Sequence, residues 1–125
     1  MSLLVDVFVI EDDGEMRLLD VPVGCSGMAG FESWRRTVWG SEALRSLGAR
    51  YFPALADGDL TVAPDQVSDF LAECALVRSN LESFAPQREP GARDEGYVRQ
   101  VSERLANIES ASLRALESGG GVVVW

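Results

Sequence analysis

One short segment constrains the fold more than any other: the unbroken apolar run Val122-Val123-Val124-Trp125 that follows three glycines. Four such residues favour a β-strand, and without a partner strand they would be a template for aggregation. We therefore expect them to pair inside a sheet. The natural neighbour is the segment 3–10, whose β-branched and aromatic side chains predict a strand with both faces largely covered.

Turn chemistry places the elements that follow the first strand. The sequence Glu11-Asp12-Asp13-Gly14-Glu15 predicts a hairpin turn, because Asp-Gly readily adopts the required positive φ. The returning strand is expected over residues 16–23. A glycine-punctuated loop over 24–30 then leads into shorter elements, which we expect as a helix from about Gly30 to Trp39, a helical turn from Ser41 to Gly48, and a short strand over 60–62.

Two long amphipathic segments predict an αα-hairpin. The first begins at Pro64, a favoured first helical residue, and should run to about Phe84. The second is expected from Asp94 to Ser118, and residues 85–93 between them are predicted to be a mobile linker. Apolar residues recur at helical spacing in both, namely at Val67, Phe70, Leu71, Cys74, Val77 and Leu81 and then at Val98, Val101, Leu105, Ile108 and Leu116.

These elements predict a single α+β domain over residues 1–125. Its small, mostly antiparallel sheet combines the N-terminal hairpin with the C-terminal strand. The αα-hairpin and a shorter helical segment are expected to cover one face of this sheet.

Composition excludes several classes of function. The formal net charge of −9 disfavours nucleic acid and anionic membrane surfaces as partners, since both bind basic patches. The chain has no histidine, which removes histidine-based triads and the commonest metal ligand. All of its basic residues are arginine, so Schiff-base chemistry on lysine is also excluded. We therefore predict no catalytic residue, no metal site and no cofactor.

Two isolated cysteines bear on compartment and on an alternative function. No secretory leader is apparent, so we expect Cys25 and Cys74 to be reduced thiols of a cytoplasmic protein. Cys74 lies on the apolar stripe of its helix and is expected in the core. Cys25, in the loop Gly24–Gly30, could serve an enzyme or a small-ligand site, but the chain offers no histidine as its base.

Acidic residues are concentrated in two segments, 1–20 and 57–73, each with a net charge of −5. In the second, Asp65, Asp69 and Glu73 recur every four residues and should form a ridge on one side of a helix, with Leu76 at nearly the same angle. An apolar residue within an acidic ridge suits a basic protein partner. The alternative is a solvated helix face. Together with the preceding turn, the predicted partner surface comprises Asp57, Asp59, Asp65, Asp69, Glu73 and Leu76.

One arginine is expected inside the structure. Arg35 falls beside the apolar stripe of its predicted helix, and a buried guanidinium needs a carboxylate. Asp6, the only charge in the first strand, is the proposed partner, and the pair would join helix to sheet. Alternatively, Arg35 reaches solvent with its stem over Trp39.

The resulting functional hypothesis is a non-catalytic acidic protein-binding module that neutralises a basic partner, as an immunity protein or antitoxin does. Two alternatives come from other classes. One is an enzyme or small-ligand-binding protein that uses carboxylates or Cys25. The other is a self-associating structural protein whose C-terminal strand forms a homodimer.

Overall fold

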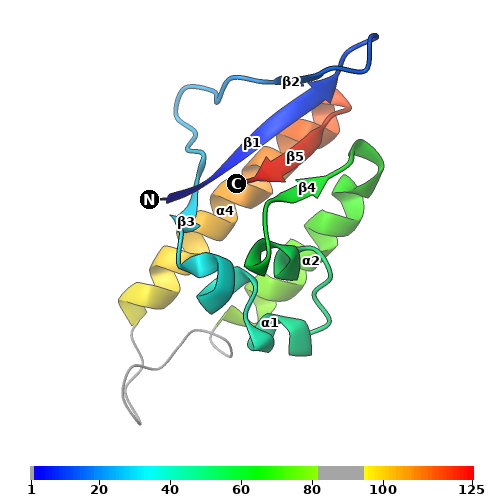
Figure 1. The fold of residues 1–125 in the computed structure, drawn as a ribbon. Coiled ribbons are helices and arrows are strands. Elements are labelled where there is room, and N and C mark those ends of the chain that lie inside the picture. The colour runs from blue at the N-terminus through cyan, green and yellow to red at the C-terminus, as the bar shows by residue number, and fades with distance from the viewer. Residues whose placement is uncertain (1, 82–94) are drawn as a thin grey trace.

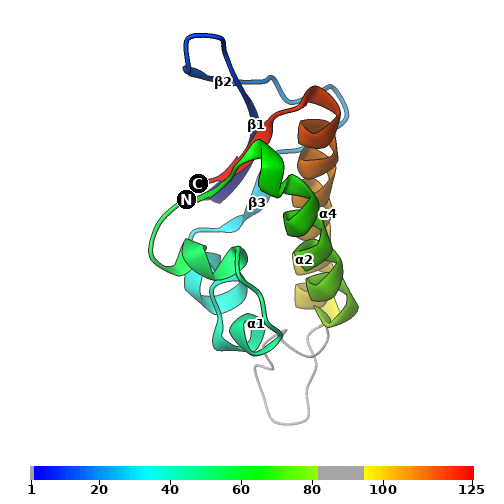
Figure 2. The same ribbon diagram turned by 90° about the vertical axis from the view of Figure 1, so that its right-hand side faces the viewer.

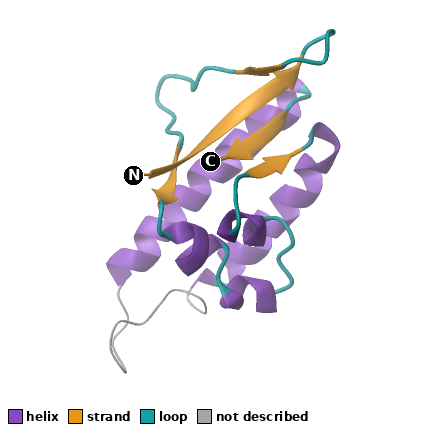
Figure 3. Cartoon of the chain, in the orientation of Figure 1, coloured by secondary structure: helices purple, strands orange, loops and turns teal. Residues whose placement is uncertain are grey.

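The structure is a computed structural model that describes residues 2–81 and 95–125. In this part of the chain, the strands form one antiparallel sheet in the order β2-β1-β5-β4 (Figures 1 and 3). Strands β2 and β3 share one edge of β1: β2 pairs with its C-terminal end and β3 with its N-terminal end. The α+β class is therefore confirmed. The strands are β1 (Ser2–Ile10), β2 (Met16–Leu18), β3 (Met28–Phe31), β4 (Leu60–Val62) and β5 (Gly121–Val124).

The apolar C-terminal segment pairs as predicted. It forms β5 between β1 and β4, with Val5 opposite Val124 and Val7 opposite Val122. The pairing continues past the strand, because the backbone groups of Trp125 and Leu4 exchange two hydrogen bonds of 2.8 and 2.9 Å. Both edges of β5 are thus satisfied, which removes the exposed edge that made the segment an aggregation hazard.

Helices α2 (Val67–Ser79) and α4 (Glu95–Ser118) pack against each other on one side of the sheet (Figure 2). This is the expected helical hairpin, and its predicted linker, residues 85–93, lies outside the described residues. A 3₁₀ turn over Pro64–Gln66 precedes α2. The shorter helix α1 (Glu42–Ser46) is capped by the preceding Ser41, whose side chain accepts a hydrogen bond from the Leu44 backbone N–H.

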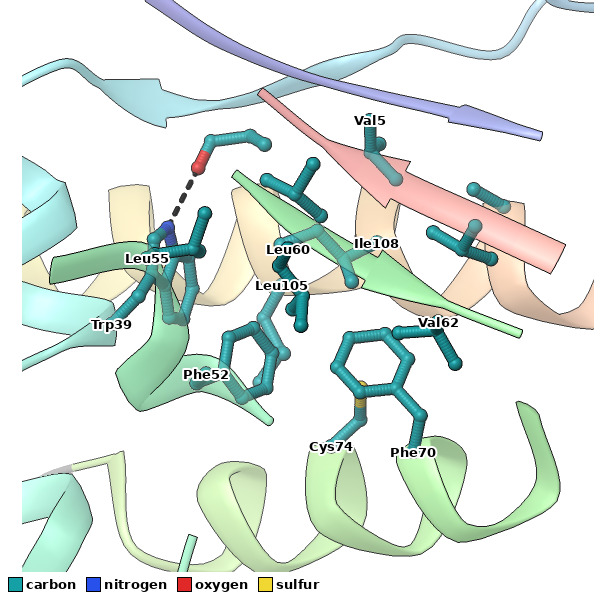
Figure 4. Close-up of a cluster of buried hydrophobic side chains, with 14 of the residues drawn as sticks. Val5, Trp39, Phe52, Leu55, Leu60, Val62, Phe70, Cys74, Leu105 and Ile108 are labelled. Atoms are coloured by element: carbon teal, nitrogen blue, oxygen red, sulfur yellow. Dashed lines mark hydrogen bonds between the residues drawn. The ribbon is translucent and has the colours of Figure 1, made fainter. Parts of the chain in front are cut away.

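The core lies between the sheet and the two long helices (Figure 4). Within it, Phe52 connects two other rings: it stacks on Trp39 at 4.9 Å between centroids and lies 5.1 Å from Phe70. Aromatic contacts of this kind add to the free energy gained from burying the rings. The fully buried side chains around them include Val5, Leu55, Val62, Cys74, Leu105 and Ile108.

The predicted helix from Gly30 to Trp39 is wrong at its start. Met28–Phe31 is strand β3, and helical structure is confined to a five-residue π-helical turn over Arg35–Trp39. Gly30 has a φ of +118°, and the Trp34 ring occupies the space that a Cβ would need there. The Trp39 indole also donates to the Ala29 carbonyl oxygen at 2.9 Å. Contacts from both tryptophans to β3 therefore favour a strand where the local sequence favours a helix.

Candidate functional site

Within residues 2–81 and 95–125, one face of the sheet has no helix packed on it, and this face is called the open face below. The alternation of side chains along β1 directs Val5 and Val7 into the core and turns Leu4, Phe8 and Ile10 to the other face. Leu4 is 45% exposed and Ile10 is 57% exposed. The expectation that both faces of this strand are covered is therefore wrong, because the long helices lie on one side only (Figure 2).

The register identifies the rest of this open face. Residues directly opposite each other in an antiparallel pair project to the same side, so the partners of Leu4, Phe8 and Ile10 belong to it. Phe8 and Val123 are nearly buried at its centre. Around them the open face presents large apolar side chains that are at least 38% exposed: Leu4, Ile10, Met16, Leu18, Met28 and Trp125.

Charge on and around the open face is acidic. Asp6 lies on it, opposite Val123 of β5, and is half-buried. Its carboxylate Oδ2 accepts a hydrogen bond of 2.9 Å from the indole N–H of Trp125, a residue that is 42% exposed. The exposed turn between β1 and β2 adds four acids at one end of the face: Glu11, Asp12, Asp13 and Glu15.

The predicted ion pair between Arg35 and Asp6 is wrong. Arg35 bonds instead to the carboxylates of Glu32 at 2.6 Å and Asp59 at 3.1 Å, and also to the Gly58 carbonyl oxygen. Asp6 projects to the open face of the sheet. Arg35 instead begins the π-helical turn, and its guanidinium bonds to the loop at Gly58 and Asp59. Burial acts to lower the pKa of Arg35, but the hydrogen bonds and charges of Glu32 and Asp59 outweigh it and raise that pKa.

Of the three acids predicted to form the ridge, Asp65 and Asp69 are exposed but Glu73 is not. Glu73 is only 8% exposed, and its carboxylate accepts hydrogen bonds from the backbone N–H groups of Arg50, Tyr51 and Phe52. This buried carboxylate anchors the backbone of residues 50–52, of which Phe52 is itself buried, and it is therefore not available to a partner. The prediction that Glu73 belongs to the partner surface is therefore wrong. Helical spacing places Glu73 on the same side as Asp69 but does not show that residues 50–52 cover it.

The other predicted partner residues are exposed but fall into two groups. Asp57 and Asp59 line an open hollow of about 440 Å³ beside Arg35, where Asp59 is already paired. Asp69 and Leu76 line a smaller hollow of about 230 Å³ together with Tyr51. Asp65 is exposed in the 3₁₀ turn before α2. Whether any of them contacts a partner stays a prediction.

The two cysteines differ in accessibility. Cys25 is exposed in the loop between β2 and β3, whereas Cys74 is fully buried on α2. Burial raises the pKa of the Cys74 thiol far above its ordinary value, and the nearby charges of Glu109 and Glu73 raise it further. Within residues 2–81 and 95–125, no three His, Cys, Asp or Glu side chains are placed to hold a metal ion.

We expect a chromogenic disulfide reagent to label one thiol of the native protein, Cys25, at the rate of an exposed cysteine in an unfolded chain. Cys74 should react only as the protein unfolds, because it is buried and remains a neutral thiol. Time courses with and without urea measure both. Labelling of native Cys25 many times faster than that of the unfolded chain would favour the alternative of a reactive-cysteine enzyme.

Comparison with known proteins adds no family to this description. The chain matches no protein-family model, no curated protein and no solved structure. Among the helices described, none is both long enough and apolar enough to cross a bilayer. The functional argument therefore depends on the surface of the chain itself.

Proposed function

We propose that this chain is a non-catalytic protein-binding module that docks a basic protein on the open face of its sheet. The observation that carries the proposal is the group of exposed apolar side chains on that face, to which β1, β2, β3 and residue 125 contribute. A contiguous apolar surface with a polar rim is typical of protein interfaces. An immunity protein or antitoxin that covers a basic toxin is one example of such a module.

Charge favours a basic partner over a second copy of the chain. Arg17 of β2 is the one arginine in the described strands, and because it lies opposite Val9 it projects away from the open face, where it bonds to Glu11. A twofold contact through this face would bring two copies of Asp6 together without a counter-ion, which is unfavourable when water is excluded. The acidic turn between β1 and β2 would instead attract a basic surface and accelerate its association.

An affinity capture from host lysate tests this proposal with two matched variants. Ile10→Glu introduces a charge into the open face, whereas Leu113→Glu introduces the same charge at an exposed position of α4. Both sites are at least half exposed, so neither change should alter stability by more than about 0.5 kcal/mol. We expect wild type and Leu113→Glu to retain the same basic protein and Ile10→Glu to lose it.

Three outcomes would contradict the proposal. Equal capture by Ile10→Glu would exclude the open face as the docking surface. Loss of the partner from an Asp65→Arg/Asp69→Arg variant, with normal capture by Ile10→Glu, would move the docking surface to α2. Sedimentation of wild type as a dimer and of Ile10→Glu as a monomer would show that the face serves self-association.

A further inference from the structure

We infer that the partner places an arginine side chain against Asp6 and Trp125, at the centre of the open face; this inference rests on the proposed function. Asp6 is the charged residue of that face, and it lies between apolar neighbours on β1 and β5. Among residues 2–81 and 95–125, the Trp125 indole is the one hydrogen-bond donor to its carboxylate. The carboxylate is therefore only partly satisfied by the chain itself.

Docking changes the surroundings of this carboxylate. In the free protein Asp6 is half-buried, so water can reach it. A partner that covers Leu4, Ile10 and Leu18 would remove this water. A desolvated carboxylate is strongly unfavourable unless a cation or several donors replace the water, and a single basic side chain supplies both the charge and the donors, so we expect the partner to bring a basic group to this position.

The geometry favours a guanidinium over an ammonium group. The indole N–H occupies one carboxylate oxygen of Asp6, Oδ2, and so leaves Oδ1 for an incoming donor. Trp125 next to it is 42% exposed, so part of this aromatic residue is open to a partner. A planar guanidinium can bond to a carboxylate and stack on an aromatic ring at the same time, which a compact ammonium group does less well. The apolar residues around this pair would contact apolar side chains next to the arginine.

A displayed library of random 12-residue peptides provides the probe. Peptides are selected on the wild-type chain, and those that also bind Ile10→Glu are discarded, so the survivors require the open face. We expect arginine with adjacent apolar residues to be enriched among them. Exchange of that arginine for citrulline, its uncharged analogue, should weaken binding at least ten-fold.

The readout and the controls follow from the structure. Trp34 and Trp39 are buried, so a change in tryptophan emission on binding reports mainly on Trp125. Asp6→Asn keeps a carbonyl oxygen for the indole N–H, but it removes the charge and replaces the other acceptor oxygen with an NH2 donor, so it should weaken the selected peptides at least ten-fold. Asp69→Asn removes an exposed charge from α2 and should leave their binding unchanged.

The outcomes separate this inference from the proposed function. Survivors without an excess of arginine, or survivors that bind wild type and Asp6→Asn equally, would show that the arginine contact is wrong while the docking face stands. Equal binding of the arginine and citrulline peptides would show the same, independently of any variant. Failure to recover any peptide that distinguishes wild type from Ile10→Glu would overturn both the docking face and the arginine contact.

Discussion

Replacing Glu73 by alanine is expected to lower the free energy of unfolding by about 3 kcal/mol or more. The substitution removes the acceptor of the backbone N–H groups of Arg50, Tyr51 and Phe52, and the last of these is buried. A buried donor without an acceptor is unfavourable, and hydrogen bonds to a charged group are stronger than neutral ones. The loop that loses its anchor also carries Phe52, which stacks on Trp39 in the core.

Urea unfolding curves measure this effect, and two further variants sharpen it. Asp69→Ala, one turn earlier on the same helix, removes an exposed carboxylate and should change stability by less than about 0.5 kcal/mol. Glu73→Gln should also destabilise, because its amide group turns a donor toward backbone donors. If Glu73→Ala were as stable as Asp69→Ala, the carboxylate would not be the anchor of this loop.

The second large effect is expected at Gly121, where alanine should lower the free energy of unfolding by about 3 kcal/mol. A Cβ at this position would overlap the Val62 carbonyl oxygen and the Phe8 ring. Both belong to strands that flank β5, so relief of the overlap would have to separate β5 from β4 or displace Phe8. Calorimetry should show a melting temperature lower by about 10 °C.

Gly58→Ala is the matched control for this substitution. Gly58 has open space at its Cβ position and no positive φ, so alanine there should be nearly neutral. A melting temperature for Gly121→Ala within a degree of that of Gly58→Ala would show that β5 can move away from β4 at little expense in stability.

The sequence predicts elements best where a strong local pattern agrees with the final packing. The apolar stripe of α2 and the Ser41 cap of α1 are local patterns, and both elements form within a few residues of their predicted starts. The C-terminal strand is predictable because four apolar residues have few alternatives to a sheet. Strand β3 is not predictable in this way, since its conformation depends on Trp34 and Trp39, which follow it in the chain.

The candidate site is harder to predict because each charged residue depends on its tertiary surroundings. The spacing of Asp69 and Glu73 does not distinguish the exposed carboxylate from the buried one. Glu73 is buried because the loop at residues 50–52 lies over it and donates hydrogen bonds to it. One residue of β1 does indicate the open face in the sequence. Asp6 interrupts the apolar run, and it lies on the side that no helix covers in the described structure. An acid in an otherwise apolar strand indicates that one face reaches water.

The position of β5 also governs how the chain reaches its folded state. Strands β1 and β4 do not pair with each other, and β5 lies between them although it is made about 60 residues after β4. Asp6 and Trp125, which bond to each other, are 119 positions apart in the sequence. During synthesis on the ribosome β1 can pair with β2 and β3 early, but the connection to β4 must wait for residues 121–124, and until then the β5-facing edges of β1 and β4 have no partner strand.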